Sequence, residues 1–248
     1  MKYRPKLSFW SFIFASMNQE VVIKSSTKQA VLFGASGLIG GYCLEYLLNH
    51  PAYSSVLVLG RRIPEYRHEK LTALQVDFED MASWANQIRG DDLFICLGTT
   101  MKKAGSKKAF YHMEFEYIAD LVAYAELHRM KQLMLVSALG ADSSSVFFYN
   151  QVKGKIEETV RCRDFWSIHI FRPSVLIGSR EEVRPMESFA AGAGMALRLL
   201  GPKLFAGITP IEGEKVALSM VKAAQGTRSG VFYYPSGVMS KMGKKEKN

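Results

Sequence analysis

Three polar side chains in the middle of the chain have the types and the spacing for acid–base chemistry. Tyr149 and Lys153 lie four residues apart, so on a helix they share one face about one turn apart. A phenol with its ordinary pKa of about 10 carries protons poorly at neutral pH, but a nearby ammonium group favours phenolate and lowers that pKa. Ser137 ends an apolar run, where its hydroxyl could bond a substrate oxygen. The three residues suit carbonyl reduction, and a packed tyrosine beside a surface lysine is the alternative.

A binding loop for a hydride-carrying dinucleotide is expected upstream, in the stretch VLFGASGLIGG. Gly34, Gly37 and Gly40 stand between an apolar run and a helical pattern. Such a turn needs one glycine with positive φ, one that lets the pyrophosphate reach bare backbone, and one that lets the helix pack closely. The helix N-terminus adds unpaired N–H groups and partial positive charge. This context predicts a dinucleotide site, against a glycine-rich turn that binds nothing.

Arg61 and Arg62 indicate which dinucleotide is bound. They follow the second expected strand, at the place where a carboxylate would bond the 2′-hydroxyl of the adenosine ribose. No acid stands there, and the planar guanidinium group suits phosphate. The two arginines therefore predict NADP(H), with a solvated basic turn as the alternative.

Two further stretches are candidates for the rim of this site. Asp77 and Phe78 follow the third expected strand and could bond the adenine amino group and cover its face, although a helix cap explains Asp77 equally well. Residues 98–100 break the fourth strand, and ligands of an open parallel sheet lie beyond the carboxyl ends of its strands. The basic stretch 101–108 is expected to be a flexible loop, folded over the site or merely solvated.

Apolar runs alternate with helical patterns, which predicts a doubly wound, Rossmann-type parallel α/β sheet with helices on both faces. Residues 29–238 are expected to form one domain, in which 179–213 is a small substrate-side segment with a helix at 189–200. The expected strands are 30–33, 55–59, 72–76, 92–97, 132–136, 167–171 and 230–234. The expected helices are 38–49, 79–89, 109–130, 212–225 and the one carrying Tyr149 and Lys153.

Both ends of the chain are expected to lie outside this domain. The leader, 1–28, begins with three cations before a short apolar run, which imitates a secretory signal but is too short to span a bilayer. A dispensable or mis-assigned leader, with the start at Met17, is the favoured interpretation; an amphipathic surface anchor and a signal are the alternatives. The charged tail, 239–248, is expected to be disordered.

Composition limits the partners. The chain has 248 residues, 48% hydrophobic and 22% charged, and most of its formal charge of +9 lies at the two ends. The body gives weak grounds for a nucleic-acid partner, although a basic protein favours anionic ligands such as a phosphorylated cofactor. Cys43, Cys96 and Cys162 are odd in number and widely spaced, which predicts neither a metal site nor disulfides and favours the cytoplasm.

The glycine loop, the strand-end Ser137 and the Tyr149–Lys153 pair together resemble the short-chain dehydrogenase/reductase superfamily, of its atypical or extended type. Arg172-Pro173 fits that branch. The segments GASGLIG, LGRR, VDFED, CLGTTMKKAGS, GADSSSVFFYNQVKGKIE and FRPSVLIGSREEVRP resemble in particular the Tat-interacting-protein-like family of oxidoreductases and its bacterial relatives. The resemblance covers about residues 29–225, and CLGTT and the YxxVKG block are its specific parts.

This resemblance implies an NADP(H)-binding oxidoreductase with Ser137, Tyr149 and Lys153 as catalytic residues. Ala138 stands where relatives often carry a second serine, and the superfamily's catalytic asparagine is not identifiable, so the donor to the substrate oxygen stays open. Taken together, the residue patterns and the resemblance give these candidate cofactor-binding residues: Gly34, Ala35, Ser36, Gly37, Leu38, Ile39, Gly40, Arg61, Arg62, Asp77, Phe78, Leu97, Gly98, Thr99, Lys153 and Pro173.

Two classes of function follow from these features. One is an NADPH-dependent reductase that transfers a hydride to a small carbonyl substrate; the other is an NADPH-binding redox sensor or regulatory protein without turnover. Retention of the serine, tyrosine and lysine favours the enzyme. A nucleotide-sugar epimerase is a weaker interpretation, because 179–213 has no basic cluster beyond Arg180 and Arg184. A homodimer or a regulatory protein partner also fits, and integral membrane association is not expected.

Overall fold

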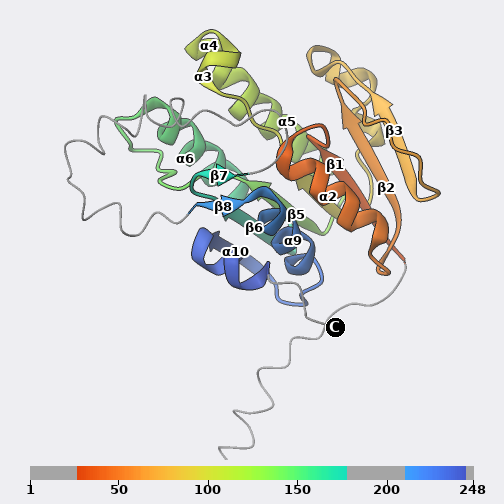
Figure 1. Ribbon diagram of the computed structural model, residues 1–248. Coiled ribbons are helices and arrows are strands. Elements are labelled where there is room, and N and C mark those ends of the chain that lie inside the picture. Colours follow the sequence, from red (N-terminus) through yellow and green to blue (C-terminus); the bar gives the residue numbers. More distant parts are fainter. Residues whose placement is uncertain (1–26, 178–209, 244–248) are drawn as a thin grey trace, which may run out of the picture.

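The computed structural model describes residues 27–177 and 210–243, which are built around one parallel sheet (Figure 1). Its seven strands lie in the order β3-β2-β1-β4-β5-β6-β9, and every neighbouring pair is parallel. This confirms the predicted doubly wound fold. The strands are β1 (Lys28–Phe33), β2 (Tyr53–Gly60), β3 (Leu71–Gln75), β4 (Asp92–Ile95), β5 (Gln132–Val136), β6 (Ser167–Arg172) and β9 (Gly230–Pro235). Short strands β7 (Leu176–Ile177) and β8 (Ile211–Glu212) pair separately.

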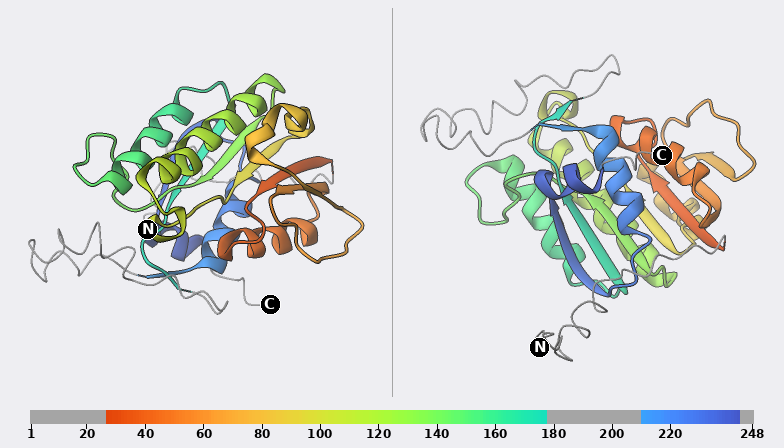
Figure 2. Two further views of the ribbon diagram at one scale, coloured as in Figure 1. Left: turned by 90° about the horizontal axis from the view of Figure 1, so that it is seen from above. Right: turned by 60° about the horizontal axis from the view of Figure 1, so that its bottom comes forward.

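Helices cover both faces of the sheet (Figure 2). One face carries α2 (Leu38–Asn49), α9 (Gly213–Ala223) and α10 (Ser236–Met242). The other carries the 3₁₀ turns η1 (Phe78–Ser83) and η2 (Ala85–Gln87) and the helices α5 (Tyr117–Leu127) and α6 (Phe148–Arg161). Among the described residues, none of the helices has the length and apolar character needed to cross a membrane.

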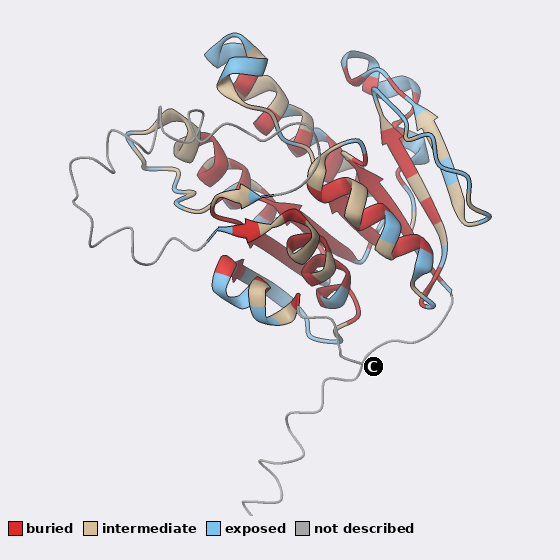
Figure 3. Cartoon of the chain, in the orientation of Figure 1, coloured by how far each residue is buried: buried red, intermediate tan, exposed pale blue. Residues whose placement is uncertain are grey.

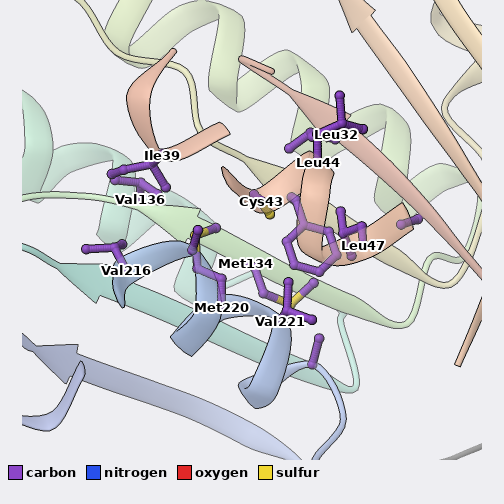
Figure 4. Close-up of a cluster of buried hydrophobic side chains, with 14 of the residues drawn as sticks. Leu32, Ile39, Cys43, Leu44, Leu47, Met134, Val136, Val216, Met220 and Val221 are labelled. Atoms are coloured by element: carbon purple, nitrogen blue, oxygen red, sulfur yellow. The ribbon is translucent and has the colours of Figure 1, made fainter. Parts of the chain in front are cut away.

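The apolar runs of the strands follow from this layered arrangement. In β1, Ala30 and Leu32 enter the core under α2 and α9, whereas Val31 and Phe33 enter the core under α5 and α6. A strand covered on both faces must be apolar at successive positions, which is why these runs are continuous in the sequence. Figure 3 shows the resulting buried centre, and Figure 4 shows residues of α2 and α9 meeting the sheet in the first core.

Three predicted elements differ from the structure in type or continuity. The expected loop 101–108 contains two short helices, α3 (Met101–Ala104) and α4 (Lys107–Tyr111), because the hydroxyls of Thr100 and Ser106 accept backbone N–H groups and cap them. The expected helix 79–89 consists of η1 and η2, interrupted by the non-helical backbone of Asp80. The helix expected at 109–130 begins earlier, as α4, and continues through a π-helical segment, η3 (His112–Glu116), into α5.

The predicted disordered tail also begins too early. Residues 239–242 complete α10, and Met239 is fully buried against the core under α2 and α9. The hydroxyl of Ser219 in α9 donates to the Met239 carbonyl oxygen, which ties this last helix to its neighbour. The leader up to residue 26, the helix expected at 189–200 and residues 244–248 lie outside the described residues.

Candidate active site

The glycine turn has the geometry that its sequence predicts. Gly34 directly follows β1 with a φ of +87°, and a Cβ there would lie 2.5 Å from the Cys96 carbonyl oxygen. Gly37 donates its N–H to the Gly34 carbonyl oxygen at 2.9 Å and stands at the N-cap of α2, where it has no side chain to cap the helix. The first N–H groups of α2 therefore suit a phosphate ligand.

The side chains of this turn divide between core and surface. Ala35 and Ile39 are buried in the core, so only their backbone could contact a ligand, while Ser36 is exposed. Leu38 packs against Gly213 at the start of α9. The turn is thus clamped between the sheet and α9 and presents mainly backbone to its open side.

A hollow beyond the strand ends gathers most of the predicted adenosine-side residues. Arg61, Phe78 and the loop residues Leu97, Gly98 and Thr99 line it. The structure adds Met113 and Tyr117, which were not predicted as site residues from the sequence. The ring centroids of Phe78 and Tyr117 are 5.2 Å apart, so the two aromatic side chains form one wall.

Two predicted residues stand apart from this hollow. Arg62 is exposed and is not among the lining residues. Asp77 accepts the backbone N–H of Glu79 at 3.0 Å and caps η1. This is the helix cap that was the alternative to an adenine contact for this residue. An adenine contact for Asp77 stays a prediction.

Tyr149 and Lys153 lie one turn apart on α6, as their spacing predicted. The Tyr149 ring packs 5.7 Å from the Phe110 ring of α4. Lys153 is buried, and its Nζ lies 2.6 Å from Oε2 of Glu114, which is also buried. The backbone N–H of Thr99 donates to the other oxygen of Glu114. Glu114 therefore connects the lysine of the candidate active site to the lining of the hollow.

Glu114 is not among the residues predicted from the sequence, although the sequence carries a signal for it. Phe110, Glu114, Ile118, Leu121 and Ala125 follow the spacing of one helix face. Four of the five are apolar, and all five are buried. A lone acid on a buried apolar stripe requires a partner, and that requirement marks it as a candidate site residue.

Ser137 lies at the end of β5, with its N–H donating to the Phe171 carbonyl oxygen at 2.7 Å. Its hydroxyl donates to Oε1 of the buried Glu157 at 2.5 Å. Arg172 from β6 holds the same carboxylate with two of its nitrogens. Next to this cluster the buried Pro173 accepts the N–H of Leu139 at 2.9 Å. In this arrangement the Ser137 proton is directed at Glu157.

The fold, the glycine turn and the hollow define a Rossmann protein that binds a nicotinamide dinucleotide. Residues 34–163 match the family described as NAD(P)H-binding. The chain belongs to this NAD(P)H-binding family and is of the atypical short-chain dehydrogenase/reductase type that its motifs resemble.

Individual relatives agree with this assignment. Protein HTATIP2 of Rattus norvegicus is 36% identical over 171 residues, which cover 67% of this chain and 70% of the relative. Protein fmp52, mitochondrial, of Aspergillus niger is 33% identical over 170 residues, covering 65% and 72%.

Solved structures share the fold at low sequence identity. MoeE5 in complex with UDP-glucuronic acid and NAD has a TM-score of 0.65 and 14% identity, over 84% of this chain and 76% of that one. A short chain dehydrogenase family protein from Francisella tularensis has a TM-score of 0.62 and 13% identity, over 86% and 99%.

Proposed function

We propose that the protein is an NADPH-dependent oxidoreductase that reduces a small carbonyl substrate by hydride transfer. The observation that carries this proposal is the placement of Tyr149 and Lys153 on α6, with Lys153 linked through Glu114 to Thr99 in the lining of the hollow. The alternative, a packed tyrosine beside a surface lysine, does not account for a lysine that is buried and paired with an acid.

In this proposal Tyr149, Lys153 and Ser137 have separate roles in carbonyl reduction. The dinucleotide, when bound, supplies the hydride. Tyr149 donates the proton that the developing alkoxide requires, and the Lys153 ammonium makes that donation easier by stabilising phenolate. Lys153 also holds the nicotinamide ribose. Ser137 polarises the carbonyl group, which requires its hydroxyl to turn from Glu157 toward the substrate.

The preference for NADPH over NADH rests on the end of β2. Arg61 lines the hollow there, Arg62 is exposed, and arginines rather than an acid directly follow Gly60 at the end of β2. The N–H groups at the start of α2 take the pyrophosphate, and the wall of Phe78 and Tyr117 takes the adenine ring.

A redox sensor without turnover is the second candidate, and one observation favours it. The Ser137 hydroxyl already donates its hydrogen bond to the Glu157 carboxylate, which Arg172 holds in place. A substrate oxygen would therefore have to compete with Glu157 for this hydrogen bond. A sensor would bind NADPH tightly and reduce no carbonyl compound.

The test is an assay of NADPH consumption against a panel of aldehydes and ketones, with the parent and Tyr149→Phe compared on any substrate found. Turnover should fall by about 10²-fold or more in Tyr149→Phe, while NADPH affinity stays close to the parent's, because the ring and its packing are kept. Tyr124→Phe, on α5, is the matched control and should retain parental turnover. Parental turnover in Tyr149→Phe would contradict the catalytic assignment, and tight NADPH binding with no reduction of any carbonyl would favour the sensor.

For the compartment we propose the reducing cytoplasm, which the three free cysteines support. The fungal relatives are named as mitochondrial proteins, so the mitochondrion is the competing location. Fractionation of cells expressing the full chain separates the two, and recovery with a mitochondrial marker would contradict the proposal.

A further inference from the structure

We propose that Glu114 is a positioning residue of the active site, which holds the Lys153 ammonium and the Thr99 backbone in one buried cluster and keeps the lysine charged. Its catalytic meaning rests on the proposed function, but the ion pair itself does not.

The local helix geometry brings Glu114 into this position. The helical run from Lys107 to Leu127 widens into the π segment η3, with Glu114 at its centre. Such π segments occur frequently at functional sites. Glu114 and the Lys153 side chain are only 1% and 5% exposed, so water contributes little to either charge.

Because both side chains are buried, the ion pair with Glu114 has a strong effect on the charge state of Lys153. A buried ammonium group without an anion is disfavoured and loses its proton more readily, whereas a carboxylate at 2.6 Å favours its charged form. The second Glu114 oxygen accepts the Thr99 N–H, which fixes the carboxylate to the loop after β4. Glu114 therefore sets both the charge of Lys153 and its position relative to the hollow.

Other charged groups stand farther along the same helix. Tyr149 lies one turn before Lys153 and Glu157 one turn after it. The Glu157 carboxylate is occupied by Ser137 and by Arg172 of β6. Glu114 pairs with Lys153 at 2.6 Å from a different helical segment, η3.

The test follows Lys153 itself and needs neither substrate nor cofactor. The protein is labelled with lysine carrying ¹³C at Cε, and the NMR signal absent from Lys153→Met identifies Lys153. In Glu114→Gln we expect the titration midpoint of this signal to fall by about one pH unit or more relative to the parent. Glu114→Asp keeps the charge but draws it back by one methylene, so a smaller fall in the same direction is expected.

Asp92→Asn is the matched control. Asp92 forms the same kind of buried pair with Lys28, at 2.5 Å, but it lies at the opposite, amino end of β4. This variant should lower the melting temperature without moving the Lys153 midpoint. If Asp92→Asn moves the midpoint as far as Glu114→Gln does, the effect is general destabilisation and the proposal is overturned.

The remaining outcomes also decide the question. If Glu114→Gln does not fold, Glu114→Asp takes its place; a midpoint equal to the parent's in every folded Glu114 variant overturns the proposal. Where a carbonyl substrate is found, the alkaline limit of kcat/KM should move to lower pH in step with the Lys153 midpoint. A shifted midpoint in a protein that reduces no carbonyl compound would refute the proposed function and leave the role of Glu114 toward Lys153 intact.

Discussion

Gly40 lies directly on the turn that it follows: a Cβ at Gly40 would sit 2.0 Å from the carbonyl oxygen of Gly34. Both partners are backbone, so neither can move aside as a flexible side chain would. Gly34 itself has a positive φ and is confined by the Cys96 carbonyl group. The separation between β1, the turn and α2 is therefore set by atoms that only glycine leaves room for.

Gly40→Ala should consequently lower both stability and NADPH affinity. Alanine normally favours a helix over glycine, but overpacking against backbone costs about 1–3 kcal/mol. At a few degrees per kcal/mol, the melting temperature should fall by several degrees. Gly237→Ala in α10, where a Cβ meets nothing within 4 Å, is the control and should leave both quantities unchanged or slightly improved. Parental melting and affinity in Gly40→Ala would contradict the close packing.

Arg61 and Arg62 should contribute unequally to the preference for NADPH. Of the two arginines, Arg61 lines the hollow and Arg62 does not, so Arg61→Ala should lose most of the preference for NADPH and Arg62→Ala much less. A charged hydrogen bond contributes about 1.5–3 kcal/mol, so calorimetry should show a change on the order of tenfold or more in the ratio of the two dissociation constants. The same parental affinity for NADH and NADPH would refute the cofactor assignment.

Most of the fold could be predicted because parallel strands that are buried on both faces appear in the sequence as continuous apolar runs. The run 132–136 and the helical pattern 38–49 agree with β5 and α2 in their bounds. The short elements could not be predicted in the same way. The helix expected at 79–89 breaks at Asp80, and α3 and α4 depend on hydroxyl caps within a stretch whose lysines suggested a solvated loop.

The candidate site was predictable only where the residue type defines the chemistry. Three features can be recognised from the residue types and their spacing alone: the glycine turn, the pair of arginines and the Tyr–Lys pair. Tyr117 acquires its role from the packing of α5 against the loop after β4, which no local pattern states, and the helical pattern marks Glu114 only as a buried acid without naming Lys153 as its partner. Ser137 was predictable as a strand-end hydroxyl, but its bond to Glu157 joins elements twenty residues apart.

Stability should decline in mild acid because of His169. This histidine is buried between Ser167 and the Tyr234 hydroxyl, and burial, with Arg228 and Lys28 nearby, lowers its pKa to about 4. Between that value and 6.5 the unfolded chain binds a proton that the folded chain does not, so folding stability decreases as the pH falls through this window. The largest loss attributable to His169 is about 3 kcal/mol.

Urea denaturation of the parent and of His169→Gln at several pH values from 7.5 to 4.5 measures this effect. The variant should be less stable at pH 7.5 because it loses buried hydrogen bonds, but its stability should depend less steeply on pH. Other acids also titrate in this range, so the difference between the two slopes is the informative quantity. Parallel slopes would show that His169 does not couple to acid unfolding.

The Ser137–Glu157 bond leads to a prediction that separates a catalytic serine from a structural one. If Ser137 turns to the substrate oxygen during reduction, Ser137→Ala should lower kcat by about 10²–10³-fold, the usual effect of removing one oxyanion donor. NADPH affinity should change little, and the melting temperature by only a few degrees, because Arg172 still holds Glu157. Ser143→Ala is the control, since the Ser143 hydroxyl also donates to a glutamate of α6, Glu158, but at the surface. A Ser137→Ala protein with parental kcat and a reduced melting temperature would assign Ser137 to the support of Glu157 and leave Tyr149 as the donor to the substrate oxygen.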